Sequence, residues 1–211
     1  MPFTLSAVEN HIFNKEKQLG LGATHYPFFQ DVIKRYGYVG QVRDSSLKEV
    51  QNEINISFKK LDEQGTPLNQ YFRAEKGFDH GNYDVEYILA LGYLNCYHLS
   101  EEENLDSLWG IVNPDITDTV SKERLLTVIK MILYYAVEVP QEIITLDTEI
   151  DASVRDYIAK VHSQSRQTLA TFEQTLPEQV SREQLKDILP YEKWSSAFRI
   201  RAHLAPELAK A

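Results

Sequence analysis

Helix-start signals recur along this chain and constrain its fold more than any other feature. A serine followed three residues later by Glu or Gln occurs at residues 6–9, 46–49, 100–103 and 181–184. In such a capping box the serine accepts a hydrogen bond from a first-turn N–H, and the Glu or Gln reaches back to the cap. Alternation of apolar and polar residues hints at a strand only at Ile143 to Leu146. We therefore predict an all-α fold.

Glycine and proline divide the predicted helices. The clearest amphipathic helix runs from Leu47 to Leu61. A helix from Asp84 to Leu91 is expected to end in a left-handed cap at Gly92. Another is expected from Ser121 to its close at Pro140. Residues 68–82 show no clear helical or strand pattern and could hold a short helix, a long loop or the remains of a binding loop.

The composition is that of an ordinary globular protein. Of the 211 residues, 43% are hydrophobic and 25% are charged, which suits one domain with extensions or two small domains. A chain of this size can bury a core without metal or disulfide support. The net charge of −9 disfavours binding to nucleic acid or to anionic lipid. The single cysteine, Cys96, can form no internal disulfide.

Membrane insertion is not expected, because no apolar run approaches the ~18 residues of a membrane span. Residues 1–17 lack the charged start and apolar core of a secretory signal. They contain Glu9 and no Arg, which argues against an uncleaved mitochondrial transit peptide. We expect a cytoplasmic protein.

Residues 83–139 form the stretch around which the chain is organised. They read as helix, short linker, helix, polar loop and helix. The polar loop NPDITDTVSKER spans residues 113–124. Asn113, Asp115, Thr117 and Ser121 stand at its positions one, three, five and nine, where their oxygens could face a cation.

The segments LALGYL, SEEENLDSLW and NPDITDTVSKERLLTVI resemble an EF-hand pair of the calmodulin superfamily. Trp109 stands four residues before the loop, at the usual aromatic position. Val120 stands at loop position eight, where an apolar residue normally pairs with the partner loop. The resemblance implies an EF-hand-like helix–loop–helix pair with N- and C-terminal helical extensions. In style the chain is similar to ciliate EF-hand-like proteins, many of which have axonemal or other cytoskeletal roles.

The loop lacks the groups that hold calcium. Calcium needs six to eight oxygens, with a bidentate Glu at position twelve and a Gly at position six. Position six is Asp118 and position twelve is Arg124, a cation where the carboxylate should be. Glu123 is one residue away and points about 100° around the helix. We expect a vestigial loop, with no bound metal and no other cofactor.

Two stretches could supply the partner hand. One is DEQGTPL at residues 62–68, and the other is RAEKGFDHGN at residues 73–82, which fits the helix order better. This reading divides the chain into an N-terminal helical extension at 1–45, an EF-hand-like domain at 46–140 and a C-terminal helical extension at 141–211.

Catalytic chemistry finds little support in the sequence. Cys96 and His98 could form a nucleophile and base, but no third group accompanies them. Asp79-His80 reads as a turn, not as a metal-phosphohydrolase signature. Phosphate-loop, zinc-protease and serine-hydrolase motifs are absent from the sequence. We expect a protein that is not an enzyme and has no small-molecule substrate.

The last segment places Trp194, Phe198, Arg201 and Leu204 near one another on a helix. Trp, Phe and Arg are typical interface anchors when they are exposed. These side chains either pack on the chain's own core or dock into a protein partner, and we take them as candidate partner-binding residues.

The sequence therefore favours a non-enzymatic structural or adaptor subunit of a large assembly, with a ciliary axonemal or other cytoskeletal setting suggested by the resemblance. One alternative is a calcium-responsive sensor that opens a groove for a target helix. Another is an accessory subunit of a mitochondrial complex.

Overall fold

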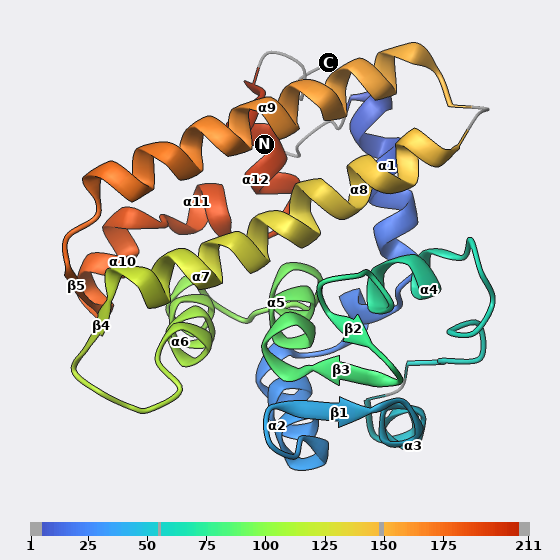
Figure 1. Ribbon diagram of the computed structural model, residues 1–211, viewed down its shortest axis with the longest axis horizontal. Coiled ribbons are helices and arrows are strands. Elements are labelled where there is room, and N and C mark those ends of the chain that lie inside the picture. The colour runs from blue at the N-terminus through green and yellow to red at the C-terminus, as the bar shows by residue number, and fades with distance from the viewer. Residues whose placement is uncertain (1–5, 55, 148–149, 207–211) are drawn as a thin grey trace.

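A computed structural model describes residues 6–54, 56–147 and 150–206, and the remaining residues of the predicted terminal extensions lie outside it. Helices make up 68% of the described residues and strands 9%, so the prediction of a mostly helical protein is confirmed at this level. Figure 1 shows two small sheets at the periphery of the helical body, one of β4 and β5 at its left edge and one of β1 to β3 in its lower part. Among the described residues, none of the helices has the length and apolarity needed to cross a membrane.

The first half of the chain carries a three-stranded antiparallel sheet in the order β1-β3-β2. Its register places Val42 opposite Tyr83. The elements of this half are α1 (Ala7–Lys17), a 3₁₀ turn (Leu21–Ala23), α2 (Tyr26–Tyr36), β1 (Gln41–Arg43), α3 (Asp44–Ile54), α4 (Pro67–Phe72), β2 (Phe78–Asp79), β3 (Asn82–Asp84) and α5 (Val85–Asn95).

The second half carries a two-stranded antiparallel sheet of β4 and β5, in which Val120 lies opposite Val180. Its elements are α6 (Glu101–Val112), β4 (Thr119–Ser121), α7 (Lys122–Leu133), a π-helical turn (Tyr134–Glu138), α8 (Val139–Leu146), α9 (Ala152–Thr175), β5 (Gln179–Ser181), α10 (Arg182–Ile188), α11 (Tyr191–Trp194) and α12 (Ala197–Leu204).

Strand pairing joins segments that the predicted domain division separates. β1 ends before residue 45 and pairs with β3, while β4 pairs with β5, which lies beyond residue 140. The strand of the 113–124 loop therefore has a C-terminal partner, and neither 62–68 nor 73–82 fills that role, contrary to the prediction. Strands of two or three residues show no alternation, so the sequence pattern does not reveal them.

Helix α7 does not close at Pro140. It continues through the π-helical turn into α8, and Figure 1 shows one long helix crossing the molecule. Pro140 has no N–H to donate to the carbonyl of Ala136, four residues earlier. Ala136 lies within the π-helical turn that precedes the proline. The short alternation at Ile143 to Leu146 does not mark a strand, because these residues form the last turn of α8.

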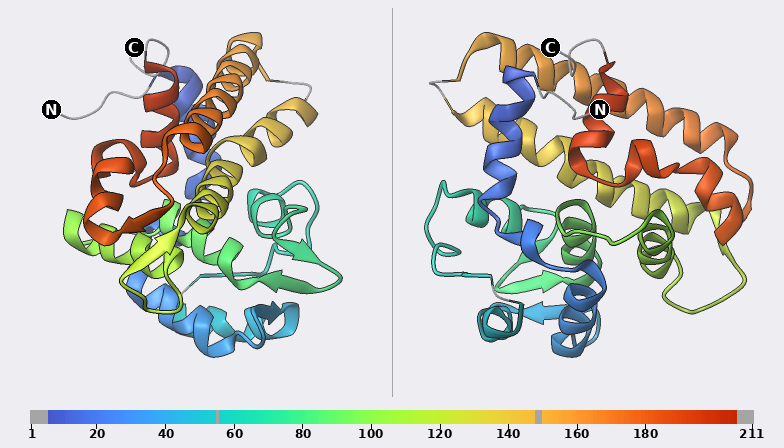
Figure 2. Two further views of the ribbon diagram at one scale, coloured as in Figure 1. Left: turned by 60° about the vertical axis from the view of Figure 1, so that its left-hand side comes forward. Right: turned by 180° about the vertical axis from the view of Figure 1, so that it is seen from behind.

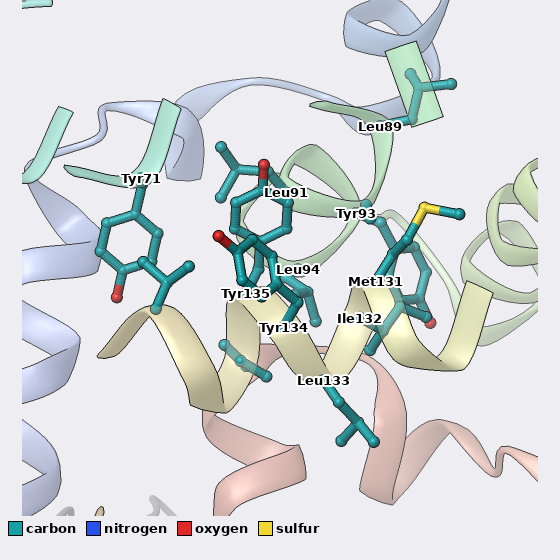
Figure 3. Close-up of a cluster of buried hydrophobic side chains, with 14 of the residues drawn as sticks. Tyr71, Leu89, Leu91, Tyr93, Leu94, Met131, Ile132, Leu133, Tyr134 and Tyr135 are labelled. Atoms are coloured by element: carbon teal, nitrogen blue, oxygen red, sulfur yellow. The ribbon is translucent and has the colours of Figure 1, made fainter. Parts of the chain in front are cut away.

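Helix α5 is the centre of the core. Every residue from Ile88 to Leu94 is buried, as expected for a helix that is apolar on all sides. Figure 3 shows Leu91, Leu94 and other buried side chains gathered against the long helix, where Tyr134 and Tyr135 follow α7. The left-handed cap predicted at Gly92 is wrong, because α5 runs on to Asn95 and Gly92 lies inside it.

The helix predicted from Leu47 to Leu61 is shorter than expected. Helix α3 starts at Asp44, so Ser46 lies inside it, and it ends at Ile54. Phe58 and Leu61 are buried in the irregular segment that follows. Their apolar spacing reflects burial rather than helix.

Gly92→Ala should lower the free energy of unfolding by about 1–3 kcal/mol, because the added Cβ would lie 2.2 Å from a ring carbon of Phe29. Gly110→Ala in α6 is the matched control. Its Cβ would meet only the flexible end of Gln30 at 3.4 Å, so it should be neutral or stabilising by up to about 1 kcal/mol. Urea unfolding followed by circular dichroism gives both values. Equal effects would contradict the close packing of α2 on α5.

Candidate functional site

Arg124 stands at the last position of the 113–124 loop and binds two other parts of the chain. Its two terminal nitrogens donate to both carboxylate oxygens of Glu86 at 2.7 and 2.8 Å. The same guanidinium donates to the carbonyls of Ile111 at 2.6 Å and Val112 at 3.0 Å. These carbonyls belong to the last turn of α6, where a helix leaves its acceptors unsatisfied. One side chain thus caps α6 and ties it to the first turn of α5.

The other candidate oxygens of the loop are mostly used within it. Asn113 Oδ1 accepts from the backbone N–H of Thr117 at 3.0 Å and from its hydroxyl at 2.8 Å. Ser121 Oγ accepts from the backbone N–H of Arg124 at 3.2 Å and so caps α7. Asp115 is exposed. The four predicted residues therefore line one hollow, but the side-chain oxygens of Asn113, Thr117 and Ser121 are engaged in hydrogen bonds within the loop.

The backbone of the loop also differs from the predicted path. Its left-handed residue is Ile116, with φ of 54°, rather than Asp118 at loop position six. A hollow of about 350 Å³ remains beside Asn113 and Arg124. Across the described ranges, no group of three or more His, Cys, Asp or Glu side chains is placed to hold a metal ion.

The first sheet has an ion-pair cluster of its own. Asp44 accepts from the hydroxyl of Tyr83 at 2.5 Å and from Arg73 at 3.0 Å, and it lies 3.1 Å from Lys48. Asp62 pairs with both Lys48 and Arg73. Partial burial raises the pKa of Asp44, but the Tyr83 hydrogen bond and the two cations outweigh it and lower this pKa. Both carboxylates are therefore matched by the chain's own donors.

The four candidate partner-binding residues do not form an exposed face. Trp194, Arg201 and Leu204 are 2%, 0% and 8% exposed, and the Trp194 ring packs 5.7 Å from that of Phe172. Phe198 is half-buried. The prediction of a partner surface is thus wrong for the three buried side chains, because α11 and α12 pack on the chain's own core.

Arg201 lies at the centre of a buried polar cluster. Its guanidinium donates to Glu16 at 2.6 and 2.9 Å and to Glu9 at 3.0 and 3.2 Å. It also donates to the carbonyl of Ala136 at 2.9 Å, the group that Pro140 leaves without its helical donor. The hydroxyl of Tyr157 donates to Glu9 at 2.6 Å. The cluster joins α1, α9, α12 and the π-helical turn.

Charges in this cluster depend on one another. Burial lowers the pKa of Arg201, but the adjacent Glu16 and Glu9 carboxylates raise it well above its usual value. Burial raises the pKa of Glu16, and Arg201 opposes that shift. Neither charged partner is stable in this site without the other.

The sequence contained a signal for this cluster. Ser6 caps α1 as predicted, accepting from the backbone N–H of Glu9 at 3.3 Å. The Glu9 side chain turns inward instead of completing the capping box. Glu9 and Glu16 alternate with Ile12 and Leu19 at three- and four-residue steps, so two acids occupy the apolar face of α1. Such acids call for a buried cation elsewhere in the chain.

Cys96 and His98 do not share a pocket among the described residues. Cys96 lines a groove that His98 does not touch, and burial raises the pKa of its thiol far above the usual value. The His98 ring lies near those of Tyr26 and Tyr93, and burial lowers its pKa to about 4. His80 lies at an exposed turn. The geometry does not assemble a nucleophile with its base.

Comparison with models of known families, with curated proteins and with solved structures finds no match. The function is therefore inferred from the residues and geometry of this chain.

Arg201→Met should lower the free energy of unfolding by about 3–5 kcal/mol, because Glu9 and Glu16 would remain buried without their cation. Arg199→Met in the same helix is the control. Arg199 is partly exposed and stacks on Tyr191, so its loss should cost about 1 kcal/mol or less. Chemical unfolding measures both.

A triple variant separates a charge effect from a packing effect. Replacing Glu9 and Glu16 by Leu together with Arg201→Met removes all three charges, and it should recover much of the lost stability. If the triple variant is less stable than Arg201→Met, the cost does not arise from uncompensated carboxylates.

Proposed function

We propose that this chain is a non-enzymatic structural or adaptor subunit of a larger protein assembly, built from degenerate EF-hand-like units that need no metal. The observation that carries the proposal is Arg124, which stands at the twelfth loop position. Its bonds to Glu86, Ile111 and Val112 fix the loop between α6 and α7. A calcium loop is held by a carboxylate and a bound ion, whereas here the chain supplies its own cation.

Strand pairing supports the EF-hand-like reading. Helix, strand and helix follow one another in α2-β1-α3, α6-β4-α7 and α9-β5-α10, and in α4-β2-β3-α5 the hairpin of β2 and β3 takes the place of the single strand. These units meet two by two through antiparallel strands. Val120, the eighth loop residue, lies opposite Val180 in its partner strand. The resemblance implied such an apolar pairing, although with a different partner segment.

Arg201 argues against the alternative of a calcium sensor. A sensor binds its target after calcium separates a helix pair and exposes an apolar groove. Here α12 packs against α9 and the π-helical turn, and Arg201 holds it there through two buried carboxylates. Removing α12 would leave those charges unmatched.

Exposed apolar side chains at loop tips support a role in binding protein. Tyr38, Val39 and Ile116 are 80%, 82% and 90% exposed. Val39 and Ile116 also have left-handed backbones, which disfavour β-branched residues. The first loop connects α2 to β1, and the second connects α6 to β4. Nothing within the described part of the chain covers these side chains, and a protein partner would do so.

A cytoskeletal or ciliary setting is the proposal that follows from the sequence resemblance, and a mitochondrial complex is the alternative.

Metal independence is tested by calorimetry with calcium and by partner capture with crosslinking. We expect calorimetry to detect no saturable binding in the micromolar range of sensor sites. The crosslinked partners should be the same with calcium and with a chelator. Micromolar binding that Asp115→Ala abolishes would contradict the proposal.

Loop-tip contacts are tested in the same capture experiment with the double variant Val39→Asp/Ile116→Asp. We expect it to lose the partners while its unfolding midpoint stays unchanged, because both side chains are exposed. Ser163→Asp, at an exposed position of α9, is the control and should retain them. Retention by the double variant would exclude the loop tips as the contact.

A further inference from the structure

A groove of about 600 Å³ opens where the end of α1, the turn Leu21–Ala23, the end of α5 and the start of α12 meet. The right-hand view of Figure 2 shows α1 running down beside α12 toward α5. This volume falls within the range of small-molecule sites, about 300–1,000 Å³. The proposed structural role does not use this groove.

Apolar side chains form most of the groove wall. They are Phe13, Leu94, Cys96, Ala197 and Phe198. The small residues Gly20, Gly22 and Ala23 line the remaining edge and leave the space open, because no long side chain projects from them. Such a wall favours an apolar molecule over a sugar or a nucleotide, whose polar groups would find few partners.

Lys17 is the charged side chain of the groove that can bind an anion. Glu16 and Lys17 both line it, but the two oxygens of Glu16 accept from Arg201 at 2.6 and 2.9 Å. The Lys17 ammonium lies over the Phe13 ring, 4.4 Å from its centre. Among the described residues, no carboxylate pairs with it. An ammonium on a ring face keeps N–H donors for an anion on its other side.

The walls are also fixed before any ligand binds. Glu16 lies on α1 and Arg201 on α12, so the buried ion pair holds the two helices that border the groove at a set separation. At its edge Gly22 leaves room for a side chain, since a Cβ there would lie at an ordinary contact distance of 3.9 Å from the Asn95 carbonyl oxygen. A preformed site loses little entropy on binding.

We propose that this groove binds a small apolar molecule with one anionic group, such as a carboxylate on a hydrocarbon chain. The apolar body lies between Phe13 and Phe198, and the carboxylate accepts hydrogen bonds from Lys17. A neutral apolar molecule is the other occupant that the test distinguishes.

The test is calorimetric titration of the full chain with dodecanoate, kept below the concentration at which it forms micelles. We expect saturable binding at one site. Dodecanol, which has the same chain without the charge, should bind about tenfold more weakly, because it loses a charged hydrogen bond. Dodecyltrimethylammonium should not bind. The absence of saturable dodecanoate binding, or equal binding of the alcohol, would overturn the proposal.

Two variants locate the site, and a third serves as control. Lys17→Glu should weaken dodecanoate binding about tenfold or more. Gly22→Trp should abolish it by filling the groove, and its backbone is outside the left-handed region, so the substitution is tolerated. Lys34→Glu changes an exposed lysine in the last turn of α2, as Lys17 is in the last turn of α1, and it should leave binding unchanged.

The variants also show how the proposal would fail. Equal weakening by Lys17→Glu and Lys34→Glu would mean that dodecanoate associates with surface charge only. Unchanged binding by Gly22→Trp would place the ligand outside the groove. Circular dichroism and unfolding midpoints confirm that each variant is folded before it is titrated.

Discussion

The buried guanidinium of Arg201 is the interaction on which the rest of the structure depends. Arg201 binds Glu9, which is 192 positions earlier in the sequence, and Glu16, which is 185 positions earlier. The first and last helices of the described chain therefore meet at this side chain. A buried ion pair adds little net stability compared with apolar residues of the same size, but removing one partner is costly. The cluster therefore fixes which helices meet, while the surrounding apolar core supplies most of the stability.

The same principle operates at a second guanidinium. Arg201 binds a helix carbonyl that Pro140 leaves unsatisfied, and Arg124 binds carbonyls at the end of α6. Each also engages a carboxylate from another helix, Glu16 or Glu86. Arginine suits both tasks because its planar fork offers five donors and its charge persists. Arg201 and Arg124 thus stabilise points at which a helix ends, contains a π-helical turn or contacts another helix.

Local signals in the sequence predicted local structure. Ser100, Ser121 and Ser181 cap their helices as expected, because capping depends on residues three positions apart. Features set by distant contacts were missed: Gly92 as a site of close packing and the continuation past Pro140 both depend on residues far along the chain. The sequence drew attention to Arg124 in the 113–124 loop, yet its role as a cap and its bond to Glu86 require knowledge of which helix lies opposite.

We propose that the terminal helices and the paired sheets form one permanently assembled body that needs no metal. Native-state amide hydrogen exchange tests the claim most directly, because it reports the opening free energy of each helix separately. The account predicts that amides of α12 and α7 exchange through the same global opening, with no change when calcium is added. A separate, lower-energy opening of α12, or protection that rises with calcium, would contradict it.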